Sequence, residues 1–156
     1  MEKRLNESGR SMVEMLGVIA IIGVITVGGI TSMGYVDSYY RTSATLLEVE
    51  QMARDINDMY SWATQFPEDT LTTTLLEEDI LESERNRWGG MISVEGHGDH
   101  FTISYSGVRR GACERIIEQA PTLKEVALSR PKSINSCTDG VTVEFTSDIP
   151  PVTPGS

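Results

Sequence analysis

The stretch MLGVIAIIGVITVGGITSMGYV, from Met15 to Val36, is 22 consecutive residues without a charge. A helix rises about 1.5 Å per residue, so this stretch reaches roughly 33 Å and can cross the hydrocarbon core of a bilayer. The alternatives are a secretory signal peptide, whose apolar region is shorter, and a buried soluble helix, which the rest of the chain could not cover. The sequence predicts a transmembrane helix.

The charges around this stretch predict its orientation. Lys3, Arg4 and Arg10 precede it, and the next basic residue is Arg41. Basic residues stay on the cytoplasmic side of a membrane. We therefore expect the N-terminus in the cytoplasm and everything after the span to be exported.

Glu14 stands at the edge of the apolar stretch, where a carboxylate drawn into lipid is costly unless it finds a partner. From Gly9 the chain reads GRSMVEMLGVIAIIGVITVGGI behind a short basic leader. The pattern is a glycine, four residues, a glutamate and an apolar helix. It resembles the class III leader of type IV pilins and related pseudopilins. The alternative is a juxtamembrane glutamate that stays among the lipid headgroups.

The resemblance implies that a membrane prepilin peptidase cuts after Gly9 and leaves Arg10 as the new, usually N-methylated terminus. The family generally has Phe, Met or Leu where this chain has Arg10. Glu14 lies about one helical turn from the new amine, so the carboxylate of one subunit can pair with the amine of a neighbour. We expect Glu14 to act in assembly.

Residues 37–66 predict the second half of the same long helix. Apolar residues recur at steps of three and four, and Pro67 ends the pattern. Glu50 and Arg54 are spaced for an ion pair along the helix. We expect one helix whose first half is apolar on all sides and whose second half is packed on one face. A coiled coil is the alternative.

The remaining residues predict a small α+β head. Short helices are expected at 74–83, 111–119 and 122–129, strands at 91–94, 101–105 and 141–146, and an acidic solvent-exposed run at 68–84. Strands 91–94 and 101–105 flank a Gly-rich turn and should form a hairpin. The last residues, 150–156, are rich in proline.

Cys113 and Cys137 are the two cysteines. If the head is exported, they should form a disulfide that closes a loop of about 25 residues. The alternative is two unpaired buried thiols. A single disulfide in the C-terminal region is also what the pilin resemblance implies, and the Asn86–Gly90 string resembles type IVb heads.

Composition excludes several classes of function. The formal charge is −10, with 23 acidic against 13 basic residues, which argues against nucleic-acid binding. His97 and His100 flank Asp99 in a turn, and a metal site would need further ligands. No nucleophile-elbow or phosphate-loop motif is present. We expect no enzyme activity, no cofactor and no metal.

The expected organisation is a leader over residues 1–9, a transmembrane and polymerisation helix half over 10–36, an amphipathic half over 37–66, a head over 67–149 and a tail over 150–156. The expected fold is α+β, a pilin fold with one long helix packed on an antiparallel sheet with one disulfide.

The pilin resemblance implies a structural pilus subunit that polymerises with itself and with other pilins. Its expected partners are the prepilin peptidase and the assembly machinery of the inner membrane. It would leave that membrane for an extracellular filament used in adhesion or aggregation. The alternatives are a minor pilin or secretion pseudopilin, and a single-span anchored binding domain that never polymerises.

Overall fold

The computed structural model describes the backbone of residues 3–147 and the side chains of residues 12–26 and 36–147. The chain divides into two compact units, Met1–Ser38 and Tyr39–Ser156. The chain is α+β, with a four-stranded antiparallel sheet and one disulfide. The predicted tail over 150–156 and the first two residues of the predicted leader lie outside the described residues.

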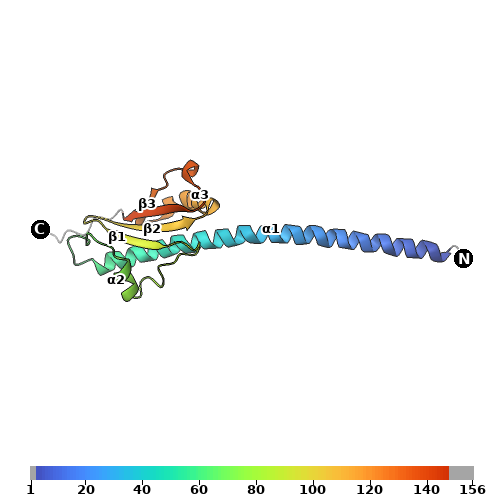
Figure 1. Cartoon of the computed structure of the whole chain (residues 1–156), viewed down its shortest axis with the longest axis horizontal. Coiled ribbons are helices and arrows are strands. Elements are labelled where there is room, and N and C mark those ends of the chain that lie inside the picture. The colour runs from blue at the N-terminus through green and yellow to red at the C-terminus, as the bar shows by residue number, and fades with distance from the viewer. Residues whose placement is uncertain (1–2, 148–156) are drawn as a thin grey trace. The chain divides into compact units, whose positions relative to one another are not determined.

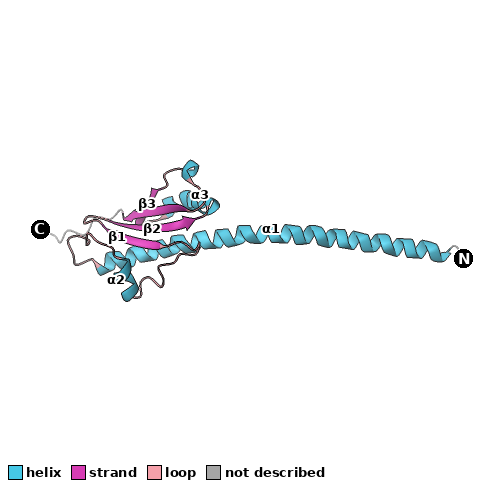
Figure 2. Cartoon of the chain, viewed as in Figure 1, coloured by secondary structure: helices cyan, strands magenta, loops and turns pink. Residues whose placement is uncertain are grey.

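The helices and strands alternate irregularly along the chain (Figures 1 and 2). In order they are α1 (Lys3–Met59), α2 (Thr72–Glu77), β1 (Ile92–Gly96), β2 (Phe101–Val108), α3 (Arg110–Gln119), the 3₁₀ helix η1 (Ala120–Thr122), β3 (Val126–Arg130), the 3₁₀ helix η2 (Ile134–Ser136) and β4 (Val141–Ser147).

Helix α1 includes the predicted membrane span, Met15–Val36. Among the residues whose side chains the structure describes, no helix is both long enough and apolar enough to cross a membrane. Residues 27–35 of the predicted span lie outside those side chains. The span therefore stays a prediction.

The end of α1 differs from the prediction. The sequence pattern predicts a helix to residue 66, but α1 ends at Met59 and turns follow. The amide of Phe66 donates to the carbonyl of Gly98 at 2.7 Å, and the Phe66 ring meets Phe101 edge-on, with 5.2 Å between centroids. In a continued helix this amide would donate to a carbonyl four residues earlier in α1. It donates to the hairpin instead, so residue 66 is not part of the helix.

The predicted hairpin is confirmed as β1 and β2, and the predicted helix over 111–119 is confirmed as α3. The expected strand over 141–146 is β4. It lies between β2 and β3 in the sheet order β1-β2-β4-β3. The alternation of apolar residues identified these strands because each has one buried face.

The prediction of a helix over residues 122–129 is wrong. Residues 126–130 form strand β3, which pairs antiparallel with β4 so that Leu128 lies opposite Phe145. The apolar residues here fit a helical spacing as well as a strand spacing. Pairing with a strand that comes later in the chain decides between them.

Helix α2 is shorter than the predicted helix over 74–83. It ends at Glu77, and Asp79 follows with a φ of 56°. The amides of Ile80 and Leu81 both donate to the carbonyl of Leu75 at 3.0 Å, which closes the helix end. This left-handed turn lets Leu81 reach the core.

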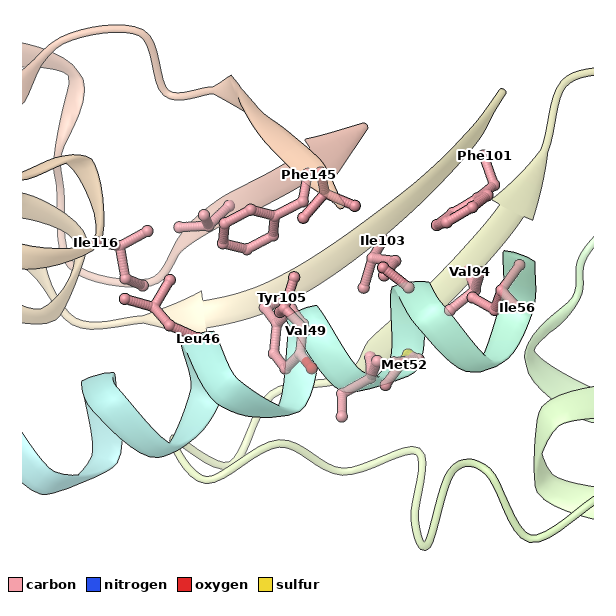
Figure 3. Close-up of a cluster of buried hydrophobic side chains, with 14 of the residues drawn as sticks. Leu46, Val49, Met52, Ile56, Val94, Phe101, Ile103, Tyr105, Ile116 and Phe145 are labelled. Carbon is pink, nitrogen blue, oxygen red and sulfur yellow. The ribbon is translucent and has the colours of Figure 1, made fainter. Parts of the chain in front are cut away.

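The core lies between the residues of α1 after Tyr39 and the inner face of the sheet (Figure 3). On the α1 side, Leu46, Val49, Met52 and Ile56 are buried, and they are part of the predicted apolar stripe. Opposite them lie buried side chains of the strands, including Val94, Phe101, Ile103, Tyr105 and Phe145. The predicted packing of one face of this helix is confirmed.

Two substitutions in α1 test this packing. Ile56 is 0% exposed and Leu47 is 71% exposed. We expect Ile56→Ala to lower the free energy of unfolding by about 2–5 kcal/mol, because it leaves a cavity. Leu47→Ala should change it by about 0.5 kcal/mol or less. Urea unfolding of the full chain in detergent, followed by tryptophan fluorescence, measures both; equal losses would contradict the described packing.

Candidate functional site

The first candidate site is the part of α1 in the first unit. Of residues 12–26, only Glu14 and Thr26 are polar. The Thr26 hydroxyl donates to the carbonyl of Ile22 at 2.7 Å, so it is satisfied within the helix. Ten large apolar side chains are exposed here, from 55% for Val18 to 74% for Val24. A surface of this kind requires a cover of lipid or protein.

Glu14 lies on this apolar helix and is itself exposed. Gly9 and Arg10 also lie within α1, and their side chains are outside the described ones. In a helix, residues four apart lie on the same face about one turn away. The backbone therefore places Arg10, the predicted new terminus, and Glu14 on one face of the same helix.

The second candidate site is a cluster around Glu48 in the second unit. Arg87 Nε lies 3.5 Å from a carboxylate oxygen of Glu48, and Arg41 donates to the carbonyl of Arg87 at 2.6 Å. Burial raises the pKa of Glu48; the nearby Arg87 opposes this and Glu82 adds to it. Removal of the carboxylate from water thus outweighs its attraction to Arg87.

Tyr105 belongs to the same cluster. Its side chain is buried, and among the described residues its hydroxyl has no hydrogen-bond partner. Burial and the charge of Glu48 raise its pKa far above the ordinary range, which keeps the phenol neutral. Sequence reasoning treats Tyr105 only as an apolar strand residue, and no signal in its neighbours marks the hydroxyl.

Asn86 organises the loop before β1, a role that sequence reasoning missed. Its side-chain nitrogen donates to the carbonyls of Ser106 (2.6 Å) and Met91 (3.3 Å). Its side-chain oxygen accepts from the amides of Trp88 (2.9 Å) and Gly90 (3.0 Å). Asparagine before paired glycines is a turn signal that could have found it. A Cβ at Gly90 would clash with the carbonyl of Ser106, so only glycine fits there.

Cys113 and Cys137 form the predicted disulfide. Cys113 lies in α3 and Cys137 directly follows η2, and both are buried. The bond joins two segments 24 residues apart that enclose β3. It restrains this region in the unfolded chain, which stabilises the folded head.

Glu50 has a different partner from the predicted one. Arg54 Nε donates to the backbone carbonyl of Glu50 at 3.3 Å, so the expected ion pair between the two side chains is wrong. The Glu50 carboxylate instead accepts from the amide of Lys124, at 3.2 Å to its nearer oxygen. A backbone amide in a turn needs an acceptor, and this contact attaches the segment before β3 to α1.

The turn between β1 and β2 carries the two histidines. His100 Nδ1 lies 2.6 Å from a carboxylate oxygen of Asp99, and the rings of His97 and His100 are 5.0 Å apart. The hydrogen bond to His100 lowers the pKa of Asp99. Within residues 12–26 and 36–147, no group of three or more His, Cys, Asp or Glu side chains could hold a metal ion.

No protein-family model matches this sequence, and no curated protein sequence matches it.

Replacement of Glu48 by Gln tests the cluster through pH. A carboxyl whose pKa is raised by folding binds its proton more tightly in the folded state. The Glu48 carboxyl therefore lowers the free energy of unfolding as the pH rises above about 4.3, the ordinary pKa of a glutamate. We expect Glu48→Gln to flatten this fall in the free energy of unfolding between pH 4 and 7. Denaturant unfolding across pH measures it, and an unchanged slope would contradict the described burial of Glu48.

Proposed function

We propose that this chain is a structural subunit of a type IV pilus, most similar in kind to type IVb pilins. The observation that carries the proposal is the pairing of Gly9 and Glu14 with an all-apolar helix. The exposed side chains of residues 12–25 support it, because they demand a cover of lipid or of other apolar helices. The disulfide also fits an exported head.

In this proposal the chain is made as an inner-membrane prepilin with its N-terminus in the cytoplasm. A prepilin peptidase removes residues 1–9, and the new amine at Arg10 is positive. Glu14 of one subunit then pairs with the amine of its neighbour as subunits are added. The apolar half of α1 exchanges lipid for other copies of itself, and the acidic head faces water in an extracellular filament.

A helix that serves only as an anchor also needs an apolar surface, so the exposed apolar side chains fit a single-span anchored protein equally well. Glu14 at the edge of this surface distinguishes the two. An anchor gains nothing from a carboxylate at the lipid boundary, whereas a polymer gains a charge pair that forms only between subunits. The number of copies in purified filaments separates a major pilin from a minor pilin or pseudopilin.

Cleavage after Gly9 gives the first test. We expect the intact mass of the mature protein to correspond to a chain that begins at Arg10, with or without one added methyl group. A membrane peptidase in the native host removes the leader, so the protein should be purified from that host's membranes and sheared surface fraction. A mature chain that retains residues 1–9 would contradict processing at this site and favour the non-polymerising anchor.

Substitutions at Glu14 give the second test. We expect Glu14→Ala to lower the yield of sheared filaments by about tenfold or more, because loss of about 1.4 kcal/mol per pairing corresponds to tenfold. Membrane insertion should be unchanged, because the apolar span is intact. Glu14→Asp keeps the charge and should retain most of the yield. Normal filament yield from Glu14→Ala would remove the assembly role of this residue.

A further inference from the structure

The second unit has a groove between α1 and the segment after α2, with a volume of about 480 Å³. We name it the acidic groove. Its lining includes four acidic side chains, one basic side chain and apolar side chains: Glu48, Asp55, Asp79 and Glu82, then Arg87, then Leu47 and Ile80. Among the described residues, no ion pair involves Asp55, Asp79 or Glu82. The groove therefore carries four acidic side chains against one basic one, beside apolar side chains.

A second surface of the same unit has the opposite charge. We name it the lysine cleft; it has a volume of about 550 Å³ and lies beside η1 and β3. It is defined by Ile117, Leu123, Lys124, Val126, Leu128 and Lys132. No acidic side chain lines it, and no described residue forms an ion pair with either lysine. Both lysines are exposed.

The two surfaces lie on opposite flanks of α1. Glu48 faces the acidic groove, where it meets Arg87. Glu50 accepts the amide of Lys124, which belongs to the lysine cleft. Residues two apart on a helix point about 200° away from each other. One copy therefore cannot bring its own groove and cleft together.

We propose that the lysine cleft of one copy docks on the acidic groove of the next copy, with Lys124 and Lys132 beside Asp79 and Glu82. This inference rests on the proposed function and names the contact between heads in the filament. The partner is a second copy because the two surfaces carry exposed charges of opposite sign beside apolar side chains, so each offers the other a complementary charge.

The position of the surfaces determines the kind of assembly. A contact between two different patches is heterologous, and when its rotation does not close a ring it extends into an open helical filament. A patch that met its own copy would stop at a dimer. Repulsion between Glu82 and Glu48, which helps to raise the pKa of Glu48, would be relieved by a lysine from a neighbour.

Charge reversal in the full chain tests the contact. We expect Lys124→Glu with Lys132→Glu to lower filament yield about fivefold or more, and Asp79→Lys with Glu82→Lys to do the same, because like charges then face each other. All four changes in one chain should restore at least half of the yield. The matched controls are Arg85→Glu with Arg109→Glu, and Glu68→Lys with Glu77→Lys, which change the same charges outside both surfaces.

Cross-linking gives a readout that does not depend on filaments. Lys124→Cys with Asp79→Cys in one chain should yield a ladder of oxidised oligomers on a non-reducing gel, because each copy offers one thiol to each neighbour. Arg109→Cys with Asp79→Cys is the control. Dimers without a ladder would overturn the heterologous contact.

The outcomes separate the two proposals. Filaments that are insensitive to both reversals and give no ladder would overturn this contact and leave the pilus function standing. A ladder from a chain that is cleaved but never forms filaments would support the contact and overturn the pilus function. Neither filaments nor a ladder would overturn both.

Discussion

The head depends on the packing of one face of α1 against the inner face of the sheet. Val49 and Ile56 are fully buried on that face, and Ile103 and Phe145 are fully buried opposite them. Burial of apolar side chains is the main favourable contribution to folding, and each strand here has only one face to bury. Buried side chains of α2 and α3, including Leu75 and Ile116, complete this core beside α1.

Polar contacts and the disulfide hold the loops of the head in place around this core. Glu50 holds the segment before β3, Asn86 holds the loop before β1, and the disulfide holds α3 to the segment before β4. Each connects backbone from distant parts of the chain. Together they position the loops on the two flanks of α1, where the acidic groove and the lysine cleft lie.

In the first unit the described apolar side chains are exposed in the single chain, unlike those that pack in the head, and Glu14 lies among them. In water such a surface is unfavourable, and in lipid the glutamate is unfavourable. Assembly with further copies would resolve both costs at once, which is why the proposal of a filament subunit accounts for the helix better than an anchor does.

Patterns among neighbouring residues were enough to predict several elements. The alternation in residues 91–105 predicted the hairpin, the helical spacing after Leu46 predicted the packed face of α1, and two cysteines left one possible bond. The proposed roles of Gly9, Arg10 and Glu14 also rest on spacing along the chain, and they stay predictions.

The remaining features depend on contacts between segments that are distant in the sequence. Residues 126–130 form a strand because they pair with β4, and Phe66, which was predicted to be helical, packs on Phe101 after α1 has ended at Met59. Glu50 accepts the amide of Lys124, and Asn86 donates to the carbonyl of Ser106, and both contacts join segments far apart in the sequence. A pattern of neighbouring residues carries no information on such contacts, because their free energy appears only when the chain has brought the segments together.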